Sequence, residues 1–363
     1  MYNATTFLTI IIPVYNGSNF IHETIQSVLQ QPCQDYELIL LDDGSKDNSL
    51  AICKEYESER VIVEHHENIG VSRTRNIGIS MARGEVIIFI DQDDAMRSNF
   101  YTEETKSQLQ TLLQQGVELF LNGTWYGDSR LKRGHFRSIE KLKKGIYDGH
   151  CDDLAWGNTY CFNANIFARS LFFDKKGKPT SVRFFDLPLD VETIFRHLTQ
   201  YSAQKLLFSD KLSFCIRRVN EESVSSTWDW VKVYKVKTYA YFNVITWHQN
   251  NFPNDKDAIE GAKKAFLKVV NEMVQVNYQA GTNLQQLIEH IKNEPYYEKL
   301  TIFAKYYPRE SRLFSLLTKN PMLIKKELHV SWLRKIIQLR WKFYNVFRRV
   351  NDIDLRKDLL TLS

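Results

Sequence analysis

Four short apolar runs in the first ninety residues constrain the fold more than any other feature of the sequence. They are rich in Ile, Val and Leu without polar alternation, and they span residues 8–12, 36–41, 60–63 and 86–90. This composition is typical of strands that are buried on both faces of a parallel sheet. The intervening segments each present one apolar helical face, and helices are expected over residues 20–30, 47–58 and 72–81.

The alternation of strand and helix predicts an α/β fold with a Rossmann-like, mostly parallel sheet and flanking helices. Ligands of such sheets bind at the carboxyl ends of the strands, so the residues that follow each strand form the candidate site. Ser45 is expected to cap the second helix. Farther along we expect strands over 117–125 and 205–217, a loop over 128–144, a helix-like segment over 156–167 and a helix over 190–200.

The second part of the chain differs from the first in composition and in hydrophobic periodicity. After about residue 227 the sequence shows long helical patterns with many Trp, Tyr and Lys residues and almost no Gly or Pro. We therefore predict a first domain over residues 1–227, with halves at 1–100 and 101–227, followed by a C-terminal α-helical region over 228–363.

Composition excludes several classes of protein. A chain of 363 residues that is 43% apolar can bury a large core, which excludes a disordered tail or a disulfide-stabilised mini-protein. Its five cysteines show no C-x-x-C spacing and indicate a reducing compartment. The first residues do not resemble a signal peptide, and no stretch approaches the ~20 apolar residues that span a bilayer. We expect a cytoplasmic protein.

The net charge of +5 is concentrated near the C-terminus, where residues 321–357 hold ten Lys or Arg against three acidic residues. Within this stretch, residues 332–350 form a predicted amphipathic helix with an aromatic and aliphatic face opposite a basic face. Such a helix suits the anionic inner face of the cell membrane, as a peripheral contact, but also packing on the domain or on a second copy in a homodimer. No nucleic-acid partner is expected, because no nucleic-acid-binding module surrounds this basic segment.

Polar motifs follow the first and second predicted strands. Residues 13–18 lack the G-x-G-x-x-G and G-K-[ST] patterns, so we expect no glycine cradle for a phosphate there. Asp42 and Asp43 follow the second strand. Carboxylates at this place accept hydrogen bonds from a base or a ribose, or they form a turn with no ligand.

The fourth predicted strand ends in the D-x-D motif of Asp91 and Asp93, whose side chains are expected to share one side of an extended chain. Acids this close repel each other unless a cation or hydrogen-bond donors lie between them. Mg²⁺ and Mn²⁺ prefer oxygen ligands and usually combine one or two carboxylates with substrate phosphates. The motif therefore predicts a divalent metal and a nucleoside diphosphate substrate; a solvated acidic turn is the alternative.

Four segments closely resemble the nucleotide-sugar half of the inverting family 2 glycosyltransferases of GT-A fold, a family that builds bacterial cell-surface glycans. In order, the segments are TIIIPVYNGSNFI, ELILLDDGSKDNS, ENIGVSRTRNIGISMARGE and VIIFIDQDD. The resemblance covers residues 8 to about 100. It implies that residues 1–100 form the nucleotide-sugar half of the domain and that residues 101–227 form the acceptor half.

The resemblance also implies roles for the strand-end residues. Pro13 and Tyr15 would flank the uracil or other base, and Asp43 would bond to the base edge with Asp42 beside it. Arg75 would help to hold the nucleotide.

Two further groups would handle the diphosphate. Asp93 would be the metal ligand, and Asp91 would contact the ribose, metal-bound water or the metal. Arg217 and Arg218 resemble a loop that closes over the diphosphate, where they would stabilise the leaving group, although a solvated surface pair is equally compatible with the sequence.

The acceptor half resembles the family more loosely. Asp190 begins a predicted helix where the family usually has a Glu-Asp pair, and the resemblance implies that this Asp is the general base. A helix N-terminus favours the ionised carboxylate that such a base needs. The Glu of the pair is missing here, Asp186 and Glu192 are rival bases, and a plain helix cap fits the same position.

These observations predict a metal-dependent inverting transferase. It would move a hexose or N-acetylhexosamine from a nucleotide-diphosphate sugar, with UDP favoured, to a hydroxyl of a cell-surface glycan or lipid-linked acceptor. Two alternatives remain open. The D-x-D motif after an apolar strand also occurs in phosphatases and phosphotransferases with an aspartyl nucleophile, and the missing Glu before Asp190 is compatible with a non-catalytic sugar-nucleotide-binding protein.

Overall fold

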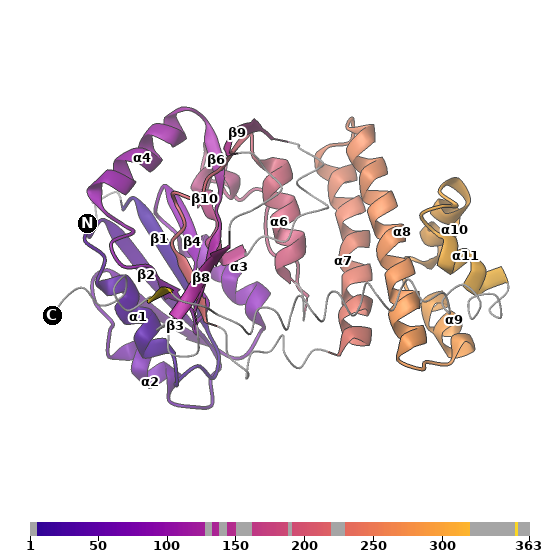
Figure 1. Cartoon of the computed structure of the whole chain (residues 1–363), viewed down its shortest axis with the longest axis horizontal. Coiled ribbons are helices and arrows are strands. Elements are labelled where there is room, and N and C mark those ends of the chain that lie inside the picture. The colour runs from indigo at the N-terminus through magenta and orange to yellow at the C-terminus, as the bar shows by residue number, and fades with distance from the viewer. Residues whose placement is uncertain are drawn as a thin grey trace. The chain divides into compact units, whose positions relative to one another are not determined.

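The structure is a computed structural model that describes residues 6–127, 133–137, 144–149, 162–187, 191–218, 229–319 and 353–354 (Figure 1). The chain divides into two compact units, here called the sheet unit and the helical unit. The sheet unit comprises residues 1–221 with 350–363, and the helical unit comprises residues 222–349. Each unit is described by itself.

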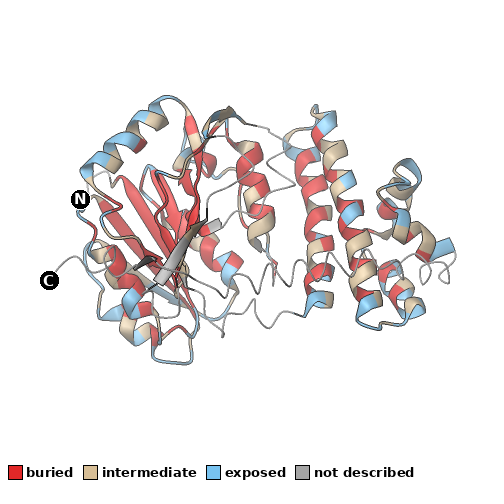
Figure 2. Ribbon diagram, viewed as in Figure 1, coloured by how far each residue is buried: buried red, intermediate tan, exposed pale blue. Residues whose placement is uncertain are grey.

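The sheet unit is built on an eight-stranded sheet with the order β3-β2-β1-β4-β10-β6-β11-β9. The strands are β1 (Leu8–Val14), β2 (Tyr36–Asp43), β3 (Val61–His66), β4 (Val86–Phe89), β6 (Val117–Leu121), β9 (Gly145–Asp148), β10 (Ile166–Ala168) and β11 (Lys205–Phe208). Strands β3, β2, β1 and β4 run parallel, as predicted, and β6 is parallel to β11. Every residue of β1, β2 and β4 is buried (Figure 2), which explains why these strands appear in the sequence as unbroken apolar runs.

Helices cover both faces of this sheet. They are α1 (Ile21–Leu29), α2 (Ser49–Lys54), α3 (Val71–Met81), α4 (Glu103–Gln114) and α6 (Val191–Ser202). Ile10 of β1 packs in one core cluster with Ile25 of α1. Ile11 faces the other way, against Gly78 of α3, where an added Cβ would lie 2.6 Å from the Ile11 side chain. The alternation of side chains along β1 thus places α1 and α3 on opposite faces.

The expectation for Ser45 is wrong. Helix α2 begins later than predicted, and its N-cap residue is Asn48. The Ser45 hydroxyl instead accepts a hydrogen bond from the backbone N–H of Asn16, at 3.0 Å. Ser45 therefore joins two strand-end loops instead of capping a helix.

Two predicted strands are each split between two sheets. The run over 117–125 forms β6 and β7 (Thr124–Gly127), and the run over 205–217 forms β11 and β12 (Cys215–Arg218). Strands β7 and β12 belong to a second, five-stranded sheet with the order β13-β8-β7-β12-β5, which also contains β5 (Ala95–Met96), β8 (Arg133–Arg137) and β13 (Ile353–Asp354). Asn122 lies at the first break, and its buried amide donates to the carbonyl oxygens of Phe120 and Ala164. These bonds hold the chain where it leaves the larger sheet.

Two other expectations are corrected. The segment over 128–144 contains strand β8 and is not loop throughout its described part. The end of the predicted helix-like segment over 156–167 is a short 3₁₀ turn (Phe162–Ala164) followed by β10, which pairs antiparallel with both β4 and β6. Phe167, one of the aromatic residues of this segment, therefore lies in a central strand, whereas residues 150–161 lie outside the described part.

The helical unit contains α7 (Trp230–Asn251), α8 (Lys256–Gln279), α9 (Leu284–Lys292), α10 (Tyr297–Tyr306) and α11 (Arg312–Lys319). Asp229 and Asp255 cap the two long helices through side-chain bonds to backbone N–H groups. A helical region after the sheet is thereby confirmed over residues 229–319, but the helical expectation does not hold at its far end, where β13 pairs with β8 and residues 350–363 group with the sheet unit. The amphipathic helix expected over 332–350 lies outside the described residues. None of the helices in the described part of the chain combines the length and apolarity needed to cross a bilayer.

An aromatic cluster attaches α6 to the sheet. The Phe195 ring of α6 stacks on Phe184 at a centroid distance of 3.7 Å and packs edge-on against Phe89 of β4 and Phe167 of β10. Phe195 is fully buried. This contact fixes the helix that begins beside the predicted general base.

We expect Phe195→Ala to lower the free energy of unfolding by about 3 to 5 kcal/mol, because it removes a buried ring and leaves a cavity among rigid neighbours. Phe195→Leu should cost less, since it retains part of the volume. Urea denaturation followed by circular dichroism measures both. A loss below about 1 kcal/mol for the Ala variant would show that α6 is not held by this cluster.

Candidate active site

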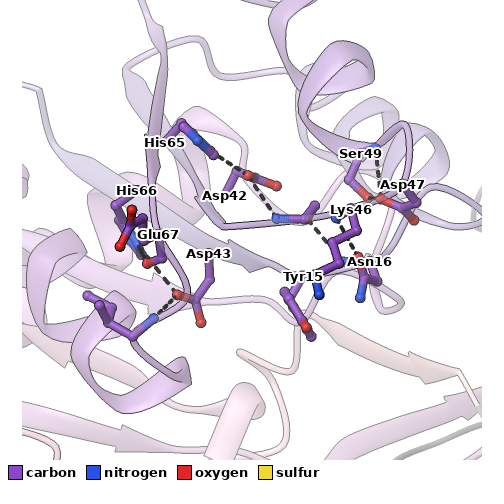
Figure 3. A network of polar contacts seen from close by, with 12 residues as sticks. Tyr15, Asn16, Asp42, Asp43, Lys46, Asp47, Ser49, His65, His66 and Glu67 are labelled. Carbon is purple, nitrogen blue, oxygen red and sulfur yellow. Dashed lines mark hydrogen bonds and ion pairs between the residues drawn. The ribbon is translucent and has the colours of Figure 1, made fainter.

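The loops that follow β1 and β2 are joined into one edge (Figure 3). The pairing of Val14 with Asp42 brings the two strand ends level. Beyond it, the Asn16 N–H donates to Ser45 Oγ, and Asn16 Oδ1 accepts from the Lys46 N–H at 2.8 Å. Asn16 has a φ of 52°, a left-handed conformation that Asn tolerates better than most residues. The loop after β1 is therefore held in its conformation by the loop after β2.

Asp42 is fully buried and holds the turn after β2. Its Oδ2 atom accepts hydrogen bonds from the Ser45 N–H at 3.2 Å and from His65 Nδ1 at 2.8 Å. From the sequence, Asp42 could either bind a ligand or form a turn. The hydrogen bonds in the structure are those of the turn. Asp42 thus supports the strand-end loop from beneath.

Asp43 holds the start of α3. Its two carboxylate oxygens accept from the N–H groups of Ile69, at 2.7 Å, and Gly70, at 3.0 Å. Gly70 has a φ of 89°, which favours glycine, and it is the residue from which α3 begins. Each oxygen keeps a further lone pair, so these bonds leave Asp43 able to accept from a ligand.

Histidines on β3 complete this arrangement. His65 lies opposite Asp42 and His66 opposite Asp43 in the parallel register, and His66 Nδ1 is 3.4 Å from Asp43 Oδ1. From the sequence alone, structural or surface roles are expected for these two histidines, with metal binding as the alternative, because no second cluster at metal-ligand spacing accompanies them. Their pairing with the two aspartates could have been inferred from two consecutive acids and two consecutive histidines at the ends of neighbouring parallel strands.

The D-x-D motif forms a turn, and the expectation of an extended chain is wrong. The Asp94 N–H donates to the Asp91 carbonyl at 3.0 Å. The Thr24 hydroxyl of α1 bonds to the carbonyl oxygens of both Gln92 and Asp94, each at 2.7 Å. The chain turns because these contacts, together with the short strand β5 that follows, draw it toward α1.

Arg75 joins the D-x-D motif to α6. Its guanidinium is 2% exposed and donates to Asp91 Oδ1 at 2.8 Å and to Glu192 Oε1 at 3.3 Å. Arg217 of β12 lies on the other side, 3.9 Å from Asp91 Oδ2 and 3.7 Å from Asp94 Oδ2. The structure therefore brings Arg75, Asp91 and Arg217 together.

The charge of Asp91 follows from these neighbours. Burial by itself raises the pKa of the Asp91 carboxyl, but the guanidinium groups of Arg75 and Arg217 and the Asn163 side chain outweigh burial and hold the pKa below its usual range. Asp91 is therefore ionised at neutral pH. Asn163 was not identified from the sequence, because it lies within the segment over 156–167 that was expected to be helix-like.

The predicted general base, Asp190, and the side chain of Arg218 lie outside the described residues. The two rival bases are both engaged by arginines. Asp186 pairs with Arg73 on the surface, and Glu192 pairs with the buried Arg75. Protonation of either rival would weaken its ion pair, because it removes the negative charge of the carboxylate.

The residues fit one mode of metal binding. Among the residues that the structure describes, no group of three or more His, Cys, Asp or Glu side chains is arranged as a metal site. That part of the chain therefore contains no metal site made of three or more such side chains. Asp91 and Asp93 offer the hard oxygen donors that Mg²⁺ or Mn²⁺ prefers when one or two carboxylates bind together with substrate phosphates.

Comparisons with known proteins show what part of the chain is similar to. Residues 9–114 match the family model described as glycosyl transferase family 2. Over 114 residues the chain is 38% identical to glycosyltransferase GlyG of Streptococcus pneumoniae, covering 31% of this chain and 35% of that protein. Over 97 residues it is 40% identical to poly(ribitol-phosphate) beta-glucosyltransferase of Bacillus spizizenii, covering 25% and 15%. The matches thus span about a third or less of these relatives.

Among solved structures, the chain is similar to S. aureus TarS 1-349 in complex with UDP-GlcNAc. The TM-score is 0.51 at 17% sequence identity, and the match covers 74% of this chain and 83% of that chain. At this identity the likeness shows the fold, which is GT-A-like.

Arg75→Met should lower the free energy of unfolding at pH 7 by about 3 to 5 kcal/mol, because it leaves the carboxylates of Asp91 and Glu192 without their buried partner. In the wild type, the depressed pKa of Asp91 contributes stability that is present above the unfolded-state pKa and lost as pH falls through the folded-state value. In the variant the pKa of Asp91 rises, so the deficit should be largest at neutral pH and should shrink on acidification. Urea denaturation at several pH values measures it.

Arg73→Met is the matched control. Arg73 lies on the same helix, and its ion pair with Asp186 is more than half exposed on both sides. Its removal should cost less than about 1 kcal/mol. Equal losses for the two variants, or a deficit that does not change with pH, would contradict the role assigned to Arg75.

Proposed function

We propose that this chain is a metal-dependent, inverting glycosyltransferase. It transfers a hexose or N-acetylhexosamine from a nucleotide-diphosphate sugar to a hydroxyl of a cell-surface glycan or a lipid-linked acceptor and forms a β-glycoside. The observation that carries this proposal is that the polar loop after β1 lies between the acidic ends of its neighbours β2 and β4, within the segment that matches the family 2 model. Open α/β sheets bind ligands at such an edge.

The donor nucleotide lies over the ends of β1 and β2. Tyr15 is 43% exposed and, with Pro13, would flank the base. Asp43 is held by two backbone N–H groups and would accept from the base edge with its remaining lone pairs. A UDP-linked donor is favoured, and the fold similarity to a protein crystallised with UDP-GlcNAc supports that choice.

The diphosphate lies near the D-x-D turn. Asp93, with Asp91, would hold a Mg²⁺ or Mn²⁺ ion, which neutralises charge on the leaving diphosphate when it is bound. Arg217, 34% exposed and adjacent to Asp91, would add a fixed positive charge, and Arg218 follows it in the chain. Arg75 is buried between carboxylates, so in this account it holds the nucleotide through Asp91.

The acceptor lies toward the start of α6. Asp190 precedes this helix and would take the proton from the acceptor hydroxyl. The hydroxyl oxygen would form a bond to the anomeric carbon on the face opposite the nucleotide, while the bond from that carbon to the diphosphate oxygen breaks. One displacement inverts the configuration, so an α-linked donor yields a β-glycoside. Glu192, two residues beyond Asp190, is tied to Arg75 and so links this end of α6 to the donor site.

The basic segment over 321–357 would place the protein on the cytoplasmic face of the membrane, where lipid-linked acceptors reside. Packing on a second copy, as a homodimer, is the competing use of that segment.

Asp93→Ala should reduce donor turnover by at least about 100-fold and weaken nucleotide binding in the presence of Mn²⁺, because it removes the proposed metal ligand. Release of nucleoside diphosphate from UDP-, GDP- and dTDP-sugars measures turnover, with and without EDTA. Wild-type turnover in this variant would reject the metal assignment. Donor binding by the wild type without turnover against a broad acceptor panel would favour a non-catalytic binding protein.

Asp190→Asn should lower kcat by about 100- to 10,000-fold, the usual contribution of a general base, and leave donor affinity nearly unchanged. Asp186→Asn is the comparison, because Asp186 is exposed and already paired with Arg73. Steady-state kinetics with a synthetic hydroxyl acceptor separates the two. A larger loss for Asp186→Asn, or loss of donor binding in Asp190→Asn, would mean that the base is misplaced.

A further inference from the structure

We propose that Gln92, the middle residue of the D-x-D motif, is a positioning residue that holds Tyr15 in place for the nucleotide. This inference rests on the proposed function and adds a residue whose role neither the motif nor the resemblance assigns. Gln92 follows β4, and Tyr15 follows β1. Its side chain therefore connects the turn that would serve the diphosphate with the loop that would serve the base.

The contact between the two residues is reciprocal. The backbone N–H of Tyr15 donates to Gln92 Oε1 at 2.7 Å, and Gln92 Nε2 donates to the Tyr15 carbonyl at 3.0 Å. One primary amide thus satisfies both backbone polar groups of one residue, as a neighbouring strand does in a sheet ladder. The β1–β4 pairing stops at Ile11 and Phe89, before these loops. Gln92 supplies a bridge beyond the end of the ladder.

Both ends of this bridge are anchored. The Gln92 carbonyl accepts a hydrogen bond from Thr24 of α1 at 2.7 Å, so the side chain starts from a fixed backbone. On the other side of the loop, the Gly17 N–H donates to Ser49 Oγ at 2.8 Å, and the Ser18 N–H donates to Asp47 Oδ2 at 3.0 Å. The β1 loop is thereby held from the β2 side and from the β4 side together.

Gly17 makes room for the bridge. A Cβ atom added at Gly17 would lie 2.3 Å from Gln92 Oε1 and 2.5 Å from Gln92 Cδ. Only glycine at position 17 leaves space for the Gln92 amide to lie over the loop. The glycine and the glutamine therefore act as a pair.

The Gln92 bridge affects the part of the site where the nucleotide base would bind. With both backbone polar groups held, the backbone of Tyr15 is fixed, and the residue is 43% exposed. A preformed aromatic surface binds a base at lower entropic cost than a mobile one. The bridge also sets the separation between the Tyr15 ring and the D-x-D carboxylates, so that one ligand meets both.

The chemistry of the bridge is specific to glutamine. Asparagine is one methylene shorter. Glutamate accepts from the Tyr15 N–H but presents its second carboxylate oxygen to the Tyr15 carbonyl, where a donor is needed. Gln92→Glu is therefore an informative variant, because it preserves size and removes one donor.

The test is titration calorimetry of the full chain with UDP, GDP and dTDP in the presence of Mn²⁺. For whichever nucleotide binds the wild type most tightly, Gln92→Ala and Gln92→Glu should each raise Kd about tenfold, as expected for the loss of one or two hydrogen bonds that order a site. Gln108→Ala, at an exposed position of α4, should leave Kd unchanged. Thermal melting confirms that all variants fold, and kcat at saturating donor should stay within about twofold of wild type.

A double-mutant cycle separates positioning from general damage. Gly17→Ala should also raise Kd about tenfold, because its methyl group displaces the Gln92 amide. The pair Gly17→Ala with Gln92→Ala should bind no more weakly than Gln92→Ala alone, since no amide is left to displace. Additive losses, or wild-type Kd in both Gln92 variants, would overturn this inference while leaving the proposed function intact. Failure of the wild type to bind any of the three nucleotides would overturn both.

Discussion

The parallel hydrogen-bonded register of β1 with β2 and β4 is the constraint on which the site depends. Because the three strands run in the same direction and lie side by side, their carboxyl ends open on one edge of the sheet, and residues far apart in the chain meet there. The loops then hold each other through side-chain to backbone bonds, such as that from the Asn16 N–H to Ser45 Oγ. These contacts are made between groups of the protein itself, from the Ser45 N–H to Asp42 as well as from the Lys46 N–H to Asn16.

Charge at this edge is arranged around a buried cation. Arg75 is almost fully enclosed and spans Asp91, in the turn after β4, and Glu192, in the first turn of α6. Removing a guanidinium from water is costly, and two carboxylates compensate for that cost only if their positions are fixed. The aromatic stack of Phe184 and Phe195 supplies that rigidity, since it attaches α6 to the sheet. Packing and electrostatics therefore support one another across the domain.

The sequence predicted the parts whose signals are local. Continuous apolar runs identified β1 to β4, and the acids that end β2 and follow β4 identified the edge. Prediction from the sequence failed where one local pattern is compatible with two structures. The chain passes from one sheet to the other at Asn122, but the residues on both sides have the composition of a single strand. The sequence could not show the contact of Gln92 with Tyr15, because that contact joins residues separated by 77 positions. The turn at Asp91 was not predicted either, because it depends on a contact with Thr24 of α1, which is distant in the sequence.

The central claim is that an activated sugar nucleotide binds where β1, β2 and β4 end. Amide hydrogen exchange, followed by mass spectrometry while UDP and Mn²⁺ are added, tests the location directly. We expect slower exchange in three separate peptides, those that contain residues 13–18, 42–46 and 91–96. Unchanged exchange at all three, with protection confined to the helices over 229–319, would contradict the account.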